Sequence, residues 1–163
     1  MARFAVVTVS DRSFAGTQTD TAGEAVTRIV ESHWPGETVH RGLVPDQMEA
    51  ITTLLHELCR QQFQLILTVG GTGLGPRDIT PEATRQLIDR EVPGLSEAMR
   101  ALTAPAYRFA WLSRAVAGLR GSTLIINLPG SQRGAVECLT AILPLLPHAL
   151  EIISGGSAHP AEG

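Results

Sequence analysis

Short apolar runs alternate with amphipathic helical stretches along most of this chain, and this alternation strongly limits the folds it can adopt. Apolar runs rich in β-branched residues predict strands at 4–9, 38–44, 63–69 and 123–128. Between them, apolar residues recur at helical spacing, which predicts helices at 22–33, 48–58, 80–92, 95–102 and 135–146. Pro144 and Pro147 should end or bend the last helix. Residues 108–118 show no clear pattern.

The predicted fold class is α/β, a single three-layer domain whose mostly parallel sheet is covered by helices on both faces, in a Rossmann-like arrangement. A chain of 163 residues with 44% hydrophobic and 18% charged content suits one core. The domain is expected to span residues 1–153. Residues 154–163, rich in Gly, Ser and Ala, are expected to form a flexible tail.

Composition excludes several classes of function. A formal net charge of −3 gives no overall basic field, which disfavours nucleic-acid binding. All 13 basic residues are Arg, so mechanisms that need a phosphate-binding or Schiff-base Lys are ruled out. Cys59 and Cys138 are isolated and are expected to be ordinary thiols. No secretory signal and no apolar run near the roughly 20 residues of a membrane span is apparent, which predicts a soluble cytoplasmic protein.

The candidate site lies where the predicted parallel strands end. Loops after such strands gather at one edge of the sheet, where ligands of open α/β folds bind. These loops carry Asp11, Asp46, Gly70–Asp78 and Pro129–Ser131. Four separate segments therefore bring polar or Gly-rich groups to a single edge.

The Gly-rich loop Gly70–Asp78 has the composition of an anion-binding nest, because its backbone can turn tightly and expose N–H groups. It is not a P-loop, since Pro76 stands where Lys is required. Pro76 also breaks the GxGxxG pattern, which disfavours a nicotinamide dehydrogenase. A plain structural turn remains the alternative.

Asp46 and Asp78 are the candidate catalytic acids. A carboxylate beside phosphate-binding amides needs a divalent cation between them, and Mg²⁺ is the usual one. The alternative for Asp46 is a helix N-cap, and for Asp78 a cap of the turn before Thr80. No His lies beside these loops and no G-x-S-x-G elbow occurs, so Ser–His catalysis is disfavoured. Nucleotidyl transfer to a phosphate needs no such base.

Four blocks of the sequence resemble the MogA/MoaB molybdenum-cofactor family, from about Ala5 to Ile152. They are Thr8–Arg12 with Gly16, Asp20 and Gly23; Leu67–Thr84; Leu112–Arg114; and Gly121–Gly130. The block around Gly70–Thr84 is the most specific. The chain departs from the family pattern at Ala22, where many relatives have Ser, and at Gln132, which replaces a proline.

The resemblance is closer to the adenylyltransferase branch, and it implies transfer of AMP from ATP to the phosphate of molybdopterin. It further implies Mg²⁺, a homotrimer and a molybdenum insertase as partner. Asp46 and Asp78 match the family's catalytic acids and are the expected Mg²⁺ contacts. The expected nucleotide- and molybdopterin-binding residues are Ser10, Asp11, Gly70, Gly71, Thr72, Gly73, Ser113, Asn127, Pro129 and Gly130. The alternative is a non-catalytic MoaB-like protein that binds molybdopterin or acts as a scaffold.

Overall fold

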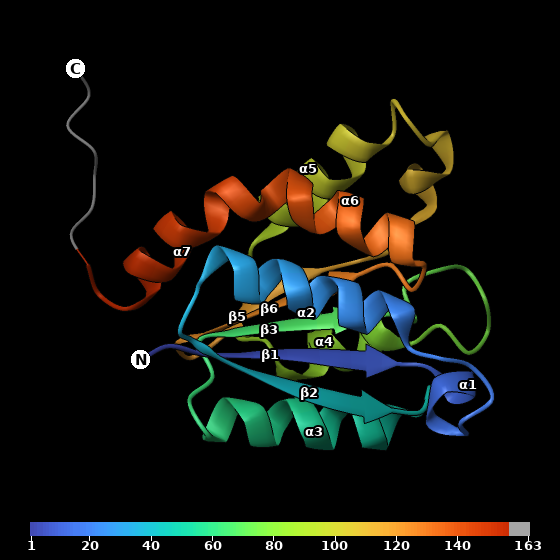
Figure 1. Ribbon diagram of the computed structural model, residues 1–163, viewed down its shortest axis with the longest axis horizontal. Helices are drawn as coiled ribbons and strands as arrows, with labels where there is room; N and C mark the ends of the chain where they lie inside the picture. Colours follow the sequence, from blue (N-terminus) through green and yellow to red (C-terminus); the bar gives the residue numbers. More distant parts are fainter. Residues whose placement is uncertain (157–163) are drawn as a thin grey trace.

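The computed structural model describes residues 1–156, which form a three-layer α/β domain built on one six-stranded sheet (Figure 1). The strand order is β2-β1-β3-β6-β5-β4. Four neighbouring strands are parallel: β2 (Thr38–Val44), β1 (Arg3–Val9), β3 (Leu65–Val69) and β6 (Thr123–Leu128). The short strands β5 (Ala117–Arg120) and β4 (Arg90–Glu91) continue the sheet in antiparallel order. The mostly parallel sheet predicted from the sequence is confirmed.

Helices cover both faces of the sheet, as Figure 1 shows. One face carries α2 (Thr21–His33), α5 (Pro93–Thr103), α6 (Gln132–Ile142) and α7 (Leu146–Ile153); the other carries α3 (Met48–Arg60) and α4 (Thr80–Leu87). The strands contribute side chains to two hydrophobic cores, one on each face of the sheet, because successive side chains of a strand point to opposite faces. Leu67 and Ile126 pack under the first set of helices, and Ile66 and Ile125 under the second.

The observed elements differ from the predicted ones in several places. The helix predicted at 80–92 ends at Leu87, and Arg90–Glu91 forms strand β4 instead. The third strand begins at Leu65, because the Phe63 N–H still bonds to the Leu58 carbonyl at the end of α3. The unassigned segment contains a 3₁₀ helix, η1 (Arg108–Leu112), and the start of β5. The last helix is interrupted by a 3₁₀ turn, η2 (Leu143–Leu145), at Pro144. From residue 157 onward, the expected tail lies outside the described residues.

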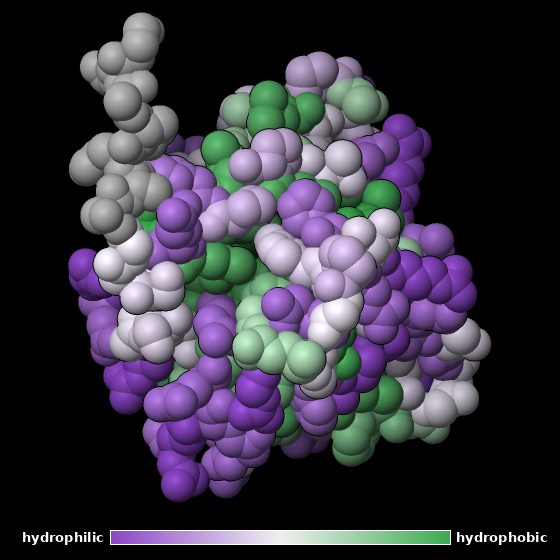
Figure 2. Space-filling model, turned by 60° about the vertical axis from the view of Figure 1, so that its left-hand side comes forward, coloured by the Kyte–Doolittle hydropathy of each residue, from purple (hydrophilic) through white to green (hydrophobic). Residues whose placement is uncertain are grey.

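The stretch Gln132–Ile153 differs from the expectation that no segment approaches membrane-spanning length. Counted as one helix through η2, it is long and apolar enough to cross a membrane by length and composition. A core helix of a soluble protein passes the same test, and Leu139 and Ile142 are fully buried against the sheet. The helix layer also exposes Leu145 and Ile152. On the face drawn in Figure 2, hydrophobic residues lie in the upper and central part and again at the lower right, while the lower left is mostly hydrophilic.

Asn127 in β6 is a fully buried polar residue that ties three elements together. Its amide nitrogen donates to the hydroxyls of Thr68 in β3 and Thr84 in α4, at 2.9 Å each. Its carbonyl oxygen accepts from the Val116 N–H at 3.2 Å. A buried amide whose hydrogen bonds are satisfied stabilises one specific packing of the core.

Replacing Asn127 with Ala should lower the free energy of unfolding by about 2 to 4 kcal/mol, because buried groups lose their partners. Urea denaturation followed by circular dichroism measures the change. Gln61→Ala, at an exposed side chain, is the control and should change stability by less than about 0.5 kcal/mol. Equal losses in the two variants would show that the buried amide adds nothing specific.

Candidate functional site

Two adjoining cavities open at the carboxyl ends of the parallel strands. We call one the acidic cavity; its wall includes Asp11, Asp46 and Asp78 together with Gly70. The other, the aromatic cavity, has a volume of about 750 Å³, and Tyr107 and Phe109 line it. The two share a wall formed by Gly71, Asp78, Gly130 and Ser131. The structure therefore brings the predicted acids and the Gly-rich loop to one edge of the sheet.

The shared wall depends on two glycines with left-handed backbone, Gly70 (φ 111°) and Gly71 (φ 70°). A Cβ at Gly71 would lie 2.3 Å from Thr80 Oγ1 and 3.3 Å from Asp46 Oδ1. Only glycine combines this conformation with so close an approach. Thr80 is the first residue of α4, whose N-cap is Ile79. Its hydroxyl donates to the Gly70 carbonyl at 2.8 Å and fastens the start of α4 to the loop.

Asp46 and Asp11 hold each other by reciprocal hydrogen bonds. The Asp11 N–H donates to Asp46 Oδ2 at 2.9 Å, and the Asp46 N–H donates to Asp11 Oδ1 at 3.0 Å. The N-cap interpretation of Asp46 is wrong: Gln47 occupies the N-cap of α3 and makes no side-chain capping bond. The Asp46 carboxylate is directed instead to the first turn of α1 (Asp11–Phe14).

Arg77 is the cation beside these acids. Its Nε donates to Asp11 Oδ2 at 2.6 Å, and its Nη2 donates to the Asp46 carbonyl at 3.2 Å. The Arg77 guanidinium lowers the pKa of Asp11. Burial raises the pKa of Asp46, and the charges of Asp11 and Asp78 add to this, outweighing the Asp11 N–H bond and Arg77. The acidic cavity thus has one carboxylate whose charge is poorly compensated.

Asp78 closes the Gly-rich loop on itself. Its Oδ2 accepts the Gly75 N–H at 2.9 Å, and its own N–H donates to the Gly75 carbonyl at 3.0 Å. A Cβ would lie 2.9 Å from Asp78 Oδ2 if placed on Gly73 and 2.7 Å if placed on Gly75. The glycines of this loop therefore make room for a carboxylate, in addition to letting the chain turn.

The three carboxylates differ in how many oxygens are free to bind a ligand. Both oxygens of Asp11 accept hydrogen bonds. In contrast, Asp46 Oδ1 and Asp78 Oδ1 accept none of the hydrogen bonds found among residues 1–156. No group of three or more His, Cys, Asp or Glu side chains in that range is arranged to hold a metal. Of these three carboxylates, Asp46 and Asp78 each have an oxygen available to a cation, whereas both Asp11 oxygens are used in bonds to Asp46 and Arg77.

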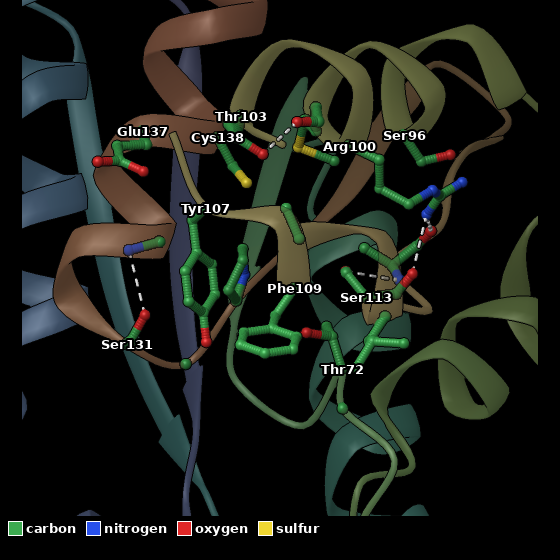
Figure 3. A pocket seen from close by; sticks show the side chains of 18 of the residues that line it. Thr72, Ser96, Arg100, Thr103, Tyr107, Phe109, Ser113, Ser131, Glu137 and Cys138 are labelled. Carbon is green, nitrogen blue, oxygen red and sulfur yellow. Dashed lines mark hydrogen bonds between the residues drawn. The ribbon is translucent and has the colours of Figure 1, made fainter. Parts of the chain in front are cut away.

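The aromatic cavity extends from the Gly-rich loop to α5 and α6. Tyr107 and Phe109 enter it from the segment around η1, as Figure 3 shows, with ring centroids 5.5 Å apart. Ser113 and Arg100 lie on its far side. Flat apolar rings with a few polar groups are suited to a planar heterocycle. Neither aromatic residue was predicted from the sequence, although three aromatic residues cluster at 107–111 in a chain with only 4% aromatic content.

The remaining predicted residues fall into three groups. The aromatic cavity is lined by Thr72, Gly73, Ser113, Pro129 and Gly130. Ser10 lines the acidic cavity, and its Oγ accepts the Ser13 N–H as the N-cap of α1. The placement of Asn127 at the pocket is wrong. Because side chains alternate along β6, Asn127 points into the core beneath α4 and reaches neither cavity.

These features define an α/β domain with a paired ligand site at the carboxyl edge of its sheet, and comparisons with known proteins agree. The family described as "Probable molybdopterin binding domain" matches residues 5–148. The chain therefore belongs to the MogA/MoaB molybdopterin-binding family of molybdenum-cofactor biosynthesis.

Relatives and solved structures extend this result. The molybdopterin adenylyltransferase of Helicobacter pylori strain J99 is 38% identical over 92% of this chain and 86% of its own length. The Drosophila melanogaster molybdenum cofactor synthesis protein cinnamon is 40% identical, but the chain spans only 25% of its length. The crystal structure of MoaB from Thermus thermophilus is 50% identical, with a TM-score of 0.87 over 95% of this chain and 98% of that one. A MogA structure is 38% identical, with a TM-score of 0.88 over 93% and 99% of the two chains.

Replacing Gly71 with Ala should destabilise the protein by about 1 to 3 kcal/mol more than replacing Gly16 with Ala, because only Gly71 is crowded. Both glycines have left-handed backbone, so both substitutions add similar backbone strain. A Cβ at Gly16 meets nothing within 4 Å, whereas one at Gly71 meets Thr80 Oγ1. Urea denaturation of the two variants gives the difference. Equal losses would mean that the loop has room for a side chain.

Proposed function

We propose that this protein is a molybdopterin adenylyltransferase, which transfers AMP from ATP to the terminal phosphate of molybdopterin and releases pyrophosphate. One observation carries the proposal. Asp46 and Asp78 line one cavity, each with a carboxylate oxygen left open, and Asp78 also lines the adjoining aromatic cavity. Such an arrangement suits a reaction between two substrates that each carry a flat ring system and phosphates.

The two cavities suggest where each part of the substrates lies. The aromatic cavity, with Tyr107, Phe109 and Ser113, suits the pterin. The acidic cavity suits the phosphates of ATP, since the Gly-rich loop and the first turns of α2 and α6 border it. Backbone N–H groups at helix starts and in Gly-rich turns bind anions. The reacting phosphates would meet at the shared wall.

The residues of the acidic cavity fit Mg²⁺. Burial and the neighbouring charges of Asp11 and Asp78 raise the pKa of Asp46, so a dication would relieve an existing repulsion. Mg²⁺ typically binds one or two carboxylates and completes its shell with phosphate oxygens and water. Asp46 and Asp78 would hold it, and when bound it neutralises charge on the phosphates. A preformed cluster of three protein ligands is therefore not required.

The protein's own groups need only position the substrates. The attacking phosphate of molybdopterin is already anionic, so no general base has to remove a proton from it. Neither cavity includes a His among the described residues that line it. Orientation by the Gly-rich loop and charge compensation supply the rate acceleration. A described lining without His is compatible with nucleotidyl transfer, which needs no His base.

We also expect a defined cellular setting for this activity. The adenylylated product would pass to a molybdenum insertase in the cytoplasm. The protein itself would be a homotrimer, and exposed apolar side chains such as Leu102, Leu145 and Ile152 are available for covering by another subunit. Sedimentation at micromolar concentration tests the assembly.

A second candidate is a MoaB-like protein that binds molybdopterin without adenylylating it. The 50% identity to the Thermus MoaB favours this reading. The open oxygens of Asp46 and Asp78 favour catalysis. Pyrophosphate release in the presence of ATP, Mg²⁺ and molybdopterin separates the two functions, and absence of release in a folded protein that still binds molybdopterin would select the second.

Asp46→Asn and Asp78→Asn should each lower single-turnover adenylylation by roughly 10² to 10³ fold while leaving molybdopterin affinity nearly unchanged, because they remove charge beside the phosphates. Asn keeps similar size and still accepts a hydrogen bond. Asp89→Asn is the matched control, since Asp89 pairs with Arg120 and lines neither cavity. Near-normal turnover in both site variants would overturn the two-carboxylate mechanism.

Asp46 should also set the acid side of the pH–rate profile. Because its pKa is raised, activity should fall as pH drops through a value above the 3.8 of an ordinary Asp, and saturating Mg²⁺ should move that limb to lower pH. The raised pKa means that the folded protein holds the proton more tightly than the unfolded chain. Proton binding by Asp46 therefore stabilises the folded protein at low pH. This contribution is lost as the pH rises from the pKa of Asp46 in the unfolded chain to its pKa in the folded protein. Asp46→Asn should consequently raise Tm at pH 7, and a lower Tm would contradict this account.

A further inference from the structure

Arg114, between η1 and β5, binds both ends of the loop Gly73–Asp78. Its Nε donates to the Gly73 carbonyl at 2.8 Å, and its Nη2 donates to the Asp78 carbonyl at 2.6 Å. Its backbone N–H also donates to the Thr72 carbonyl at 2.9 Å. One side chain thus bridges the two points where the loop leaves and rejoins the body of the protein.

Arg114 is itself fixed from two sides. Its Nη1 pairs with Glu82 Oε1 in the first turn of α4, and this interaction lowers the pKa of Glu82. On the other side, Arg100 of α5 donates to the Ser113 carbonyl at 3.2 Å and to the Ala115 carbonyl at 3.1 Å. Figure 3 shows Arg100 beside Ser113 at the edge of the aromatic cavity. The residues on both sides of Arg114 in the chain are therefore held in place.

We propose that Arg114 is a positioning residue, which holds the loop Gly73–Asp78 in the shape that presents the Asp78 carboxylate at the wall shared by the two cavities. Because Arg114 holds the Asp78 carbonyl in place, it also sets the direction in which the Asp78 side chain leaves the backbone. The fork of a guanidinium donates to separate acceptors at set angles, which a Lys ammonium does not reproduce. The role assigned to Asp78 rests on the proposed function, whereas the shape of the loop does not.

Hydrogen exchange of the free protein tests the clamp directly. In Arg114→Met and Arg114→Lys, the hydrogen-bonded amides of Gly75 and Asp78 should exchange faster by about tenfold or more, because charge-assisted bonds at both loop ends are lost or weakened. Exchange in β1, β3 and β6 should stay at the wild-type rate. Arg120→Met is the matched control, since it removes an Arg–Asp ion pair that borders neither cavity, and loop exchange should not change.

Wild-type loop exchange in Arg114→Met would overturn the proposal. Wild-type exchange and activity in Arg114→Lys would overturn the requirement for the guanidinium fork. If Arg114→Met does not fold, Glu82→Gln provides the second variant: it weakens the anchor of Arg114, and loop exchange should rise by about threefold. An unchanged loop in Glu82→Gln would then contradict the clamp.

Kinetics separates positioning of Asp78 from simple destabilisation. Arg114→Lys should lower kcat by about tenfold or more and raise the Mg²⁺ concentration for half-maximal rate, while the KM for molybdopterin stays within about twofold. A smaller active fraction alone would lower the rate without moving the Mg²⁺ requirement, and that result would overturn the link to Asp78. If the wild-type protein does not adenylylate molybdopterin, the proposed function fails, and the exchange result still decides whether Arg114 orders the loop.

Discussion

The site depends on the close approach of three backbones at Gly70. A Cβ on Gly70 would lie 2.3 Å from the Val9 carbonyl oxygen, and one on Gly130 would lie 3.2 Å from the Gly70 Cα. The ends of β1, β3 and β6 therefore meet without side chains between them. This contact lets the loops after the strands curve outward and enclose two cavities that share one wall. A side chain at Gly70 would push these ends apart and separate the cavities.

Charge in the site is arranged by the backbone as much as by side chains. The reciprocal bonds between Asp11 and Asp46 place two carboxylates close together, and Arg77 offsets mainly the first of them. Asp46 keeps a raised pKa as a result. Poorly compensated charge of this kind reduces stability, and functional sites commonly retain it because ligands supply the missing charge.

The sequence predicted the fold better than it predicted the contacts within the site. Apolar periodicity located the four parallel strands and the main helices, because it reports directly which face of each element is buried. Apolar periodicity could not show whether Asn127 faces a cavity or the core. That depends on how β6 packs against α4, which the sequence does not reveal. Nor could it resolve Asp46: an Asp before a helix satisfies the N-cap pattern, and only the tertiary approach of Asp11 redirects its carboxylate. Tyr107 and Phe109 were missed because the segment around η1 has no regular apolar period.

The wall common to the two cavities has a consequence for what happens after the reaction. Under the proposed function, molybdopterin enters the aromatic cavity and the nucleotide phosphates enter the acidic cavity. The product joins the two substrates covalently across the shared wall at Gly71 and Asp78. A linked molecule that occupies both cavities leaves more slowly than either half alone. When one half dissociates, the other half still holds it close to its own cavity, so it rebinds before the whole molecule escapes. The enzyme would then retain its own product, and a reactive intermediate held in this way is protected until a downstream protein collects it. Slow release would serve as a means of delivery.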